Sequence, residues 1–230
     1  MKLLYSPGSW LVSLQRRFAR GRVMRSRHRN HPRLALKSEW LEQRAMLSVV
    51  TNTNDSGAGS LRQAILDANL NSGIDTISFN ITDNPEIPGY ETQTISVQSA
   101  LPTITDSVII DATTQPGYTS APLVALTQSF AGGAASGLYL SGSGAGGSTI
   151  KGLAIHGFGG SGITVADTGT LGSTIEANYI GTSTGSNDAG NTRDGIDISR
   201  SANTVIRGNV IAGNASYGTI LDGSTLARTL

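Results

Sequence analysis

Residues 162–165 read Gly-Ile-Thr-Val, and residues 175–180 read Ile-Glu-Ala-Asn-Tyr-Ile. This pair, a glycine opening an alternating apolar strand and a second apolar stretch about ten residues later, occurs three times near the C-terminus. The first stretches begin at Gly137, Gly162 and Gly195, and the second at Ile150, Ile175 and Ile206. Successive units lie 25 and then 31–33 residues apart. A period of this length marks a repeat architecture whose units bury their apolar faces against one another.

The repeat unit has the period of a β-strand, not of a helix. Apolar residues occupy every second position, and the frequent glycines would weaken any helix. The residues expected to face a core are Leu138, Leu140, Ile163, Val165, Ile196 and Ile198. Coils of this length with two or three short strands predict an all-β fold, a right-handed single-stranded parallel β-helix.

Parallel stacking of such coils predicts columns of like residues. Ile150, Ile175 and Ile206 should form one apolar column, and Ile155, Ile180 and Ile211 another. Asn178 and Asn209 fall at the same place in successive coils, so their side chains should pass hydrogen bonds along the solenoid. The preceding coil has Leu153 there, so this ladder is expected to be short.

Residues 60–69 predict one helix ahead of the coils. Ser60 followed by Gln63 fits a capping box, and one face of the helix is apolar. A helix this short is marginal alone, so we expect it to cover the open end of the solenoid. The β-helix domain is then expected over 48–230, and the chain could be a fragment of a longer solenoid.

The charge is divided sharply along the chain. Residues 1–47 hold 11 Lys/Arg and 2 Glu, a net charge of +9, whereas residues 48–230 have a net charge of −8. The basic leader could be an export segment that is disordered, helical or removed, or an arm that binds nucleic acid. We favour export, and expect no nucleic-acid partner, because no folded nucleic-acid-binding motif accompanies the arginines. The chain has no cysteine, and no apolar run long enough for a transmembrane helix.

Three segments carry a family resemblance. Residues 39–48 (EWLEQRAMLS) resemble the "LE-x-R-x-(L/M)-L" segment of many planctomycete-type secreted and surface proteins, although they could instead form a short amphipathic helix. Residues 49–69 (VVTNTNDSGAGSLRQAILDAN) and the "NYIGT…GN…GI" phrase at 178–196 resemble secreted bacterial β-helix proteins of the pectate-lyase-like type. The resemblance spans about residues 39–218 and implies export and a right-handed parallel β-helix. It implies no single activity.

The candidate site follows from the outward residues of the first strands. In pectate-lyase-like enzymes, which the chain resembles, substrate lies along one parallel sheet; here the corresponding ligand groove would contain Tyr139, Thr164 and Asp197. Glycoside hydrolysis needs two carboxylates, for which Asp194 and Asp197 beside Arg193 are the candidates. Aspartates next to a strand start more often cap backbone amides. We therefore assign no catalytic site and keep a polysaccharide lyase or glycoside hydrolase as the alternative.

Metal and cofactor sites have little support in the sequence. His156 is the only histidine after residue 47 and is interpreted as a surface or turn residue at a strand end. No ligand spacing for a transition metal occurs, and calcium at Asp188 is a weak possibility beside a hydrated turn. The sequence thus predicts a secreted or cell-surface protein with a structural, adhesive or carbohydrate-contacting role. Its expected partners are polysaccharide or other cell-surface components.

Overall fold

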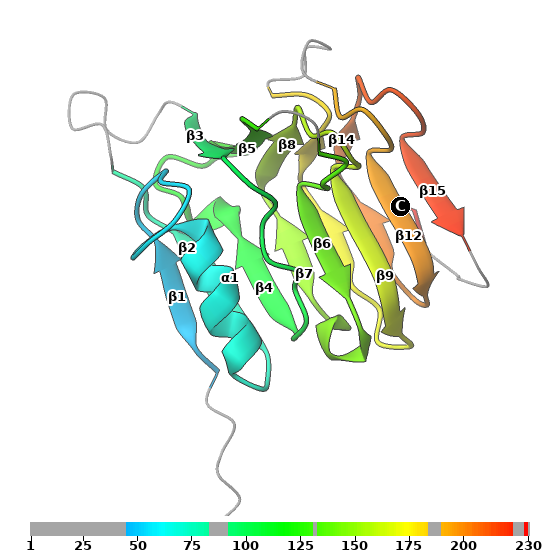
Figure 1. Cartoon of the computed structure of the whole chain (residues 1–230), viewed down its shortest axis with the longest axis horizontal. Helices are drawn as coiled ribbons and strands as arrows, with labels where there is room; N and C mark the ends of the chain where they lie inside the picture. The colour runs from blue at the N-terminus through cyan, green and yellow to red at the C-terminus, as the bar shows by residue number, and fades with distance from the viewer. Residues whose placement is uncertain (1–44, 83–91, 131–132, 184–189, 223–227, 230) are drawn as a thin grey trace, which may run out of the picture. The chain divides into compact units, whose positions relative to one another are not determined.

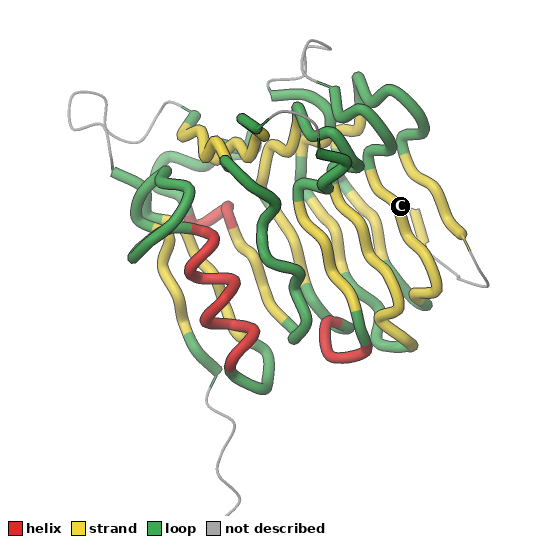
Figure 2. The backbone as a smooth tube through the Cα atoms, in the orientation of Figure 1, coloured by secondary structure: helices red, strands yellow, loops and turns green. Residues whose placement is uncertain are grey.

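Three parallel sheets, joined coil by coil, form the structure (Figures 1 and 2). The computed structural model describes residues 45–82, 92–130, 133–183, 190–222 and 228–229. Each of the later coils passes through the three sheets in a fixed order, and the next coil repeats that order. Every strand pair in the described part is parallel, with partners one coil away, as the repeat predicted.

Each sheet is a row of strands contributed by successive coils. In spatial order, sheet A contains β1 (Leu47–Val50), β2 (Asp75–Phe79), β4 (Val108–Asp111), β7 (Thr149–Lys151), β10 (Thr174–Glu176), β13 (Val205–Arg207) and β16 (Arg228–Thr229). Sheet B contains β14 (Val210–Ile211), β11 (Tyr179–Ile180), β8 (Leu153–His156), β5 (Val124–Gln128) and β3 (Gln93–Val97). Sheet C contains β15 (Thr219–Asp222), β12 (Ile196–Ser201), β9 (Ile163–Gly169) and β6 (Leu138–Ser141). A later coil runs from sheet C to sheet A and then to sheet B, and short 3-10 turns lie at Ala112–Thr114 and Ser143–Ala145.

The predicted apolar columns are confirmed by the register. Ile175 pairs with Ile150 on one side and with Ile206 on the other. The inward residues of sheet C, from Leu138 to Ile198, are at most 1% exposed. Complete burial of such a side chain contributes about 1.5–3 kcal/mol, and stacking coils with the same apolar pattern builds one continuous core.

Two asparagine ladders run along the solenoid, where the sequence predicted one. In the predicted ladder, Asn178 Nδ2 donates to Asn209 Oδ1 at 3.1 Å, and Asn178 Oδ1 accepts from the Leu153 N–H at 3.0 Å. In the second, Asn191 Nδ2 donates to Asn214 Oδ1 at 2.9 Å, between sheet B and sheet C. The second ladder could have been predicted from the sequence, since Asn191 and Asn214 both directly follow a glycine. The ladders satisfy backbone groups at corners where the strands no longer pair.

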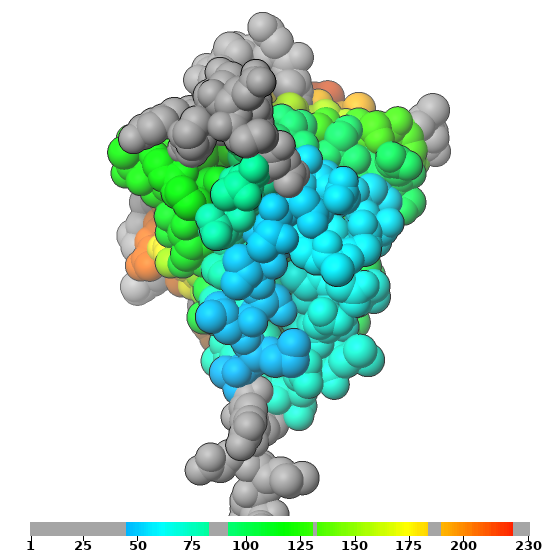
Figure 3. Space-filling view, turned by 90° about the vertical axis from the view of Figure 1, so that its left-hand side faces the viewer, coloured from blue at the N-terminus to red at the C-terminus, as the bar shows by residue number. Residues whose placement is uncertain are grey.

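Helix α1 (Leu61–Leu70) covers the N-terminal end of the solenoid, as predicted. Its buried residues are Leu61, Ala64, Ile65 and Ala68. Figure 3 shows β1, the loop after it and α1 together over this end. Half of the predicted capping box forms. Ser60 Oγ accepts from the Gln63 N–H at 3.2 Å, but the Gln63 side chain donates to Asp67 within the helix, because Gly57 already accepts the Ser60 N–H.

Several predictions for the N-terminal segment and the inserted loop fall outside the described residues. These are the leader up to Arg44 and the loop residue Asp188. Leu47, which the helical interpretation of 39–48 placed on an amphipathic helix, is the first residue of β1, so that interpretation is wrong at its end. Among the described residues, no helix is long and apolar enough to cross a membrane.

Candidate functional site

The outer face of sheet C carries the row of side chains that the sequence predicted. Thr164 in β9 pairs with Tyr139 in β6 on one side and with Asp197 in β12 on the other. Three successive coils therefore place these residues side by side, because their neighbours Leu138, Ile163 and Ile196 point into the core. Tyr139 is 40% exposed, whereas Thr164 and Asp197 are half-buried.

The row lies in a groove with a volume of about 310 Å³. One wall is formed by part of residues 98–105, which lie beside β6 through a single bridge between Ile104 and Leu140. The segment that leads into β6 also contributes. The lining residues are Ala100, Leu101, Thr103, Ala134, Ala135, Ser136, Tyr139, Ser161, Thr164, Arg193 and Asp197. The three predicted groove residues and Arg193 thus share one concave surface.

The groove offers polar groups on a partly apolar floor. Among the described residues, none donates a hydrogen bond to the Asp197 carboxylate, and none accepts one from the Arg193 guanidinium. The hydroxyls of Ser136 and Thr164 lie 2.8 Å apart and bond to each other. Burial raises the pKa of Asp197, and the charges of Asp194 and Asp222 raise it further, against a lowering by Arg193. The groove therefore presents one carboxyl group, that of Asp197, and one guanidinium, that of Arg193, which have no protein partner among the described residues.

The candidate pair of catalytic carboxylates does not meet in the groove. Asp194 is only 4% exposed, and its Oδ1 accepts the Tyr217 N–H from the next coil at 3.0 Å. It is absent from the lining, and Asp197 is the one carboxylate among the described lining residues. Asp194 thus caps a backbone amide, the role that the sequence favoured as the commoner one. Arg207, another basic residue, lies on sheet A and pairs with Glu176.

A charged pair on the same sheet lies beyond the row. Both carboxylate oxygens of Asp167 accept hydrogen bonds from Arg200, at 2.6 and 2.8 Å, across β9 and β12. Both residues have left-handed backbone, with φ of 57° and 47°, so the two coils make the same bend at the same place. The hydrogen bond from Arg200 lowers the pKa of Asp167, desolvation opposes this, and the charge of Arg200 lowers it further. The two charges therefore neutralise each other at an exposed position on the sheet.

No metal site emerges from the described part of the chain. It contains no group of three or more His, Cys, Asp or Glu side chains that could hold an ion. His156 ends β8 on sheet B beside Thr127. Its side chain is half-buried, and this burial lowers the pKa. That position agrees with the prediction of a histidine at a strand end.

The groove wall is the part of the site that the sequence did not predict. Between residues 98 and 105 the chain forms one isolated bridge and no strand. Its position depends on backbone carbonyls that accept hydrogen bonds from α1, and backbone groups leave no mark in a residue pattern. The one sequence feature that could have indicated the position of this wall was the pair Arg62 and Asn69, two polar residues that flank the apolar face of α1.

Comparison with known proteins supports the architecture and gives no activity. A family model described as "Right handed beta helix region" matches residues 136–227, which include the row and the groove floor. No curated protein matches the chain significantly. With the coil-by-coil register, this match identifies the fold as an all-β, right-handed parallel β-helix.

Proposed function

We propose that this chain is a β-helix protein of the cell surface or medium whose sheet C groove binds carbohydrate without cleaving it. The observation that carries the proposal is the groove itself, where an exposed tyrosine lies in register with Thr164 and with Asp197, whose carboxylate has no partner among the described residues. A tyrosine ring offers a rigid apolar face, on which the C–H side of a sugar can lie. Asp197, Arg193 and the Ser136 and Thr164 hydroxyls then supply donors and acceptors for sugar hydroxyls.

The charges near the groove favour a neutral polysaccharide. Residues 48–230 carry a net charge of −8, and the charge of Asp222 acts on Asp197 at the groove. An acidic polysaccharide would meet like charge there, which costs affinity and slows association. Arg193 is the one basic residue among the described lining residues, so the groove has no cationic patch.

We predict that Tyr139→Ala lowers retention on a neutral polysaccharide about tenfold or more, since it removes the largest apolar surface in the row. Tyr139→Phe should retain most of the binding. Tyr179→Ala is the matched control, because Tyr179 lies on sheet B, away from the groove lining. The measurement is sedimentation with insoluble cellulose, mannan and chitin, with polygalacturonate and alginate as acidic comparisons.

Three results would contradict the proposal. Wild-type protein that binds none of the five polysaccharides refutes carbohydrate contact at this groove. Equal loss for Tyr139→Ala and Tyr179→Ala would place the binding elsewhere. Release of soluble sugar during the assay would make the protein an enzyme and restore the lyase or hydrolase alternative.

Export is the second part of the proposal and rests on the basic leader and on residues 39–48, which resemble the leader segment of secreted proteins. We predict that protein recovered from the cell surface or medium begins near Ser48, just inside β1. N-terminal sequencing of that protein decides the matter. An intact residue 1–47 segment, on protein found only inside cells, would refute export and revive the nucleic-acid interpretation of the arginines.

A further inference from the structure

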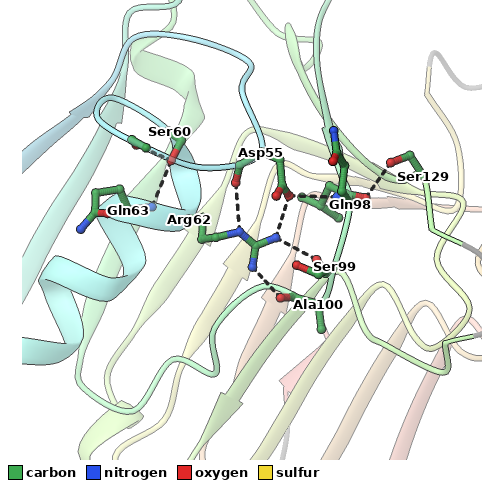
Figure 4. Close-up of polar contacts among 10 residues, drawn as sticks. Asp55, Ser60, Arg62, Gln63, Gln98, Ser99, Ala100 and Ser129 are labelled. Atoms are coloured by element: carbon green, nitrogen blue, oxygen red, sulfur yellow. Dashed lines mark hydrogen bonds and ion pairs between the residues drawn. The ribbon is translucent and has the colours of Figure 1, made fainter.

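Arg62 joins α1 to residues 98–105, which we term the wall segment. Its Nη1 donates to the Ala100 carbonyl at 2.6 Å, and its Nη2 to the Ser99 carbonyl at 2.9 Å (Figure 4). The same guanidinium donates to the backbone carbonyl of Asp55 at 3.0 Å and to its Oδ1 at 2.7 Å. Asp55 Oδ1 also accepts the Gln98 N–H at 2.9 Å. One side chain thus connects the helix, the loop before it and the start of the wall segment.

Asn69 makes a second connection at the other end of the wall segment. Its Nδ2 donates to the Thr103 carbonyl at 2.7 Å, and its Oδ1 accepts the Thr105 N–H at 2.9 Å. Asn69 follows Arg62 by seven residues, about two helical turns, so both project from the same side of α1. The helix therefore holds the wall segment at two points.

The part of the segment between these two points faces the groove. Ala100, Leu101 and Thr103 are lining residues. On its far side the segment contacts β6, where the Ile104 N–H donates to the carbonyl of Tyr139 at 2.8 Å. The wall segment is thus hydrogen-bonded to α1 on one side and to β6, the strand that carries Tyr139, on the other. The position of α1 on the solenoid therefore helps to fix the position of the wall.

Covering the solenoid end does not explain these contacts. The apolar face of α1 provides that cover, through Leu61, Ala64, Ile65 and Ala68, while Arg62 and Asn69 flank that face. Arg62 also uses Nε, Nη1 and Nη2 together, a fork geometry that lysine cannot reproduce. Burial raises the pKa of Asp55, but the hydrogen bonds from Arg62 and Gln98 and the Arg62 charge outweigh it and lower the pKa overall. The Asp55 carboxylate is therefore ionised at neutral pH and holds the fork in place.

We propose that Arg62 and Asn69 are positioning residues for the groove, and that α1 sets the shape of the carbohydrate-binding surface as well as capping the core. The expected effect on carbohydrate binding rests on the proposed function, whereas the role of Arg62 and Asn69 in positioning the wall segment does not. Loss of either side chain should free the wall segment and leave the inner coils intact.

The test uses the full chain with Arg62→Lys and Asn69→Ala, and Gln63→Ala as the control. Gln63 lies on the same helix, and its side chain donates to Asp67 of that helix. Within the described structure, the amides of the wall segment that donate hydrogen bonds are those of Gln98, Ile104 and Thr105. Amide hydrogen exchange should become about tenfold or more faster at Gln98 in Arg62→Lys, because its acceptor Asp55 is held by Arg62, and at Ile104 and Thr105 in Asn69→Ala. Exchange over residues 163–180, in the inner coils, should stay within about twofold of wild type, and Gln63→Ala should match wild type throughout.

Two exchange results overturn the inference. Unchanged exchange at Gln98 in Arg62→Lys, and at Ile104 and Thr105 in Asn69→Ala, would show that the segment holds its position without α1. Equal acceleration at these amides and over residues 163–180 would show a general loss of stability instead of a local one. Neither result involves a ligand.

Binding to cellulose, mannan or chitin tests the link to the groove. For the polysaccharide that retains wild type, we expect about tenfold weaker retention of Arg62→Lys and Asn69→Ala, but not of Gln63→Ala. Unchanged retention of variants whose wall exchanges faster would refute the link to binding. If no polysaccharide retains wild type, the proposed function fails while the exchange data still decide the positioning role.

Discussion

Replacing Asn178 with alanine is expected to lower the free energy of unfolding by about 4 kcal/mol. Asn178 is fully buried, and its side chain serves three partners. Its Oδ1 accepts the Leu153 N–H, and its Nδ2 donates to the Ile150 carbonyl at 2.9 Å and to Asn209. Alanine leaves the buried Leu153 N–H without its acceptor and removes two further hydrogen bonds, to the Ile150 carbonyl and to Asn209; the loss of such buried bonds costs about 1–3 kcal/mol each. Urea unfolding followed by circular dichroism measures the change.

The same ladder supplies graded controls. Asn209→Ala removes the Nδ2 bond to the Ile175 carbonyl and the acceptor for Asn178, but Asn209 is only half-buried, so water replaces part of the loss. Asn80→Ala changes an exposed asparagine and should alter stability by less than about 0.5 kcal/mol. Asn178→Asp keeps the acceptor and loses the donors in a buried site, so it should be at least as damaging as alanine. If Asn178→Ala and Asn80→Ala prove equally mild, the ladder does not stabilise the solenoid in this way.

The sequence predicted those parts of the fold in which side-chain burial repeats. Alternating apolar residues place Ile163 and Val165 in the core, and the period of the units places Ile150, Ile175 and Ile206 in one column. The helix over 61–70 was predictable because its apolar face and its N-cap can both be recognised from the types and spacing of the residues. In each case one residue type at a fixed spacing reports a single physical event, burial against the next coil.

The candidate site was predictable only where it follows the same alternation. Tyr139, Thr164 and Asp197 lie in register because their neighbours are buried. Asp194 precedes its strand at a turn, where alternation no longer assigns a direction. Its capping role was the commoner expectation for such an aspartate, but neither its burial nor its partner, the Tyr217 N–H, could be predicted. The wall segment was out of reach for another reason: Ser99, Ala100 and Thr103 contribute carbonyl groups, which every residue has.

Gly162→Ala is expected to destabilise the protein by about 3 kcal/mol, because the first glycine of each unit leaves no room for a Cβ atom. A Cβ on Gly162 would lie 2.5 Å from Ile180 Cγ2 and 2.8 Å from the Gly195 carbonyl oxygen of the next coil. That oxygen accepts the Ile163 N–H in the ladder, so it cannot withdraw without loss of a hydrogen bond. Overpacking of this kind costs about 1–3 kcal/mol, occasionally more. Thermal and urea unfolding of the variant measure the cost.

Gly218→Ala provides a matched control in the same column. Gly218 occupies the corresponding place one coil after Gly195. Among the described residues, a Cβ there would meet only Ile211 Cγ2, at 3.6 Å, an ordinary contact. Alanine at a compatible backbone position usually stabilises slightly, through the unfolded chain, so this variant should fall within about 1 kcal/mol of wild type. Both glycines directly precede a strand of sheet C, and among the described residues a following coil's carbonyl lies against Gly162 but not against Gly218. Equal effects of the two substitutions would mean that glycine is required by the strand start itself, and the close stacking of successive coils would lose its main support.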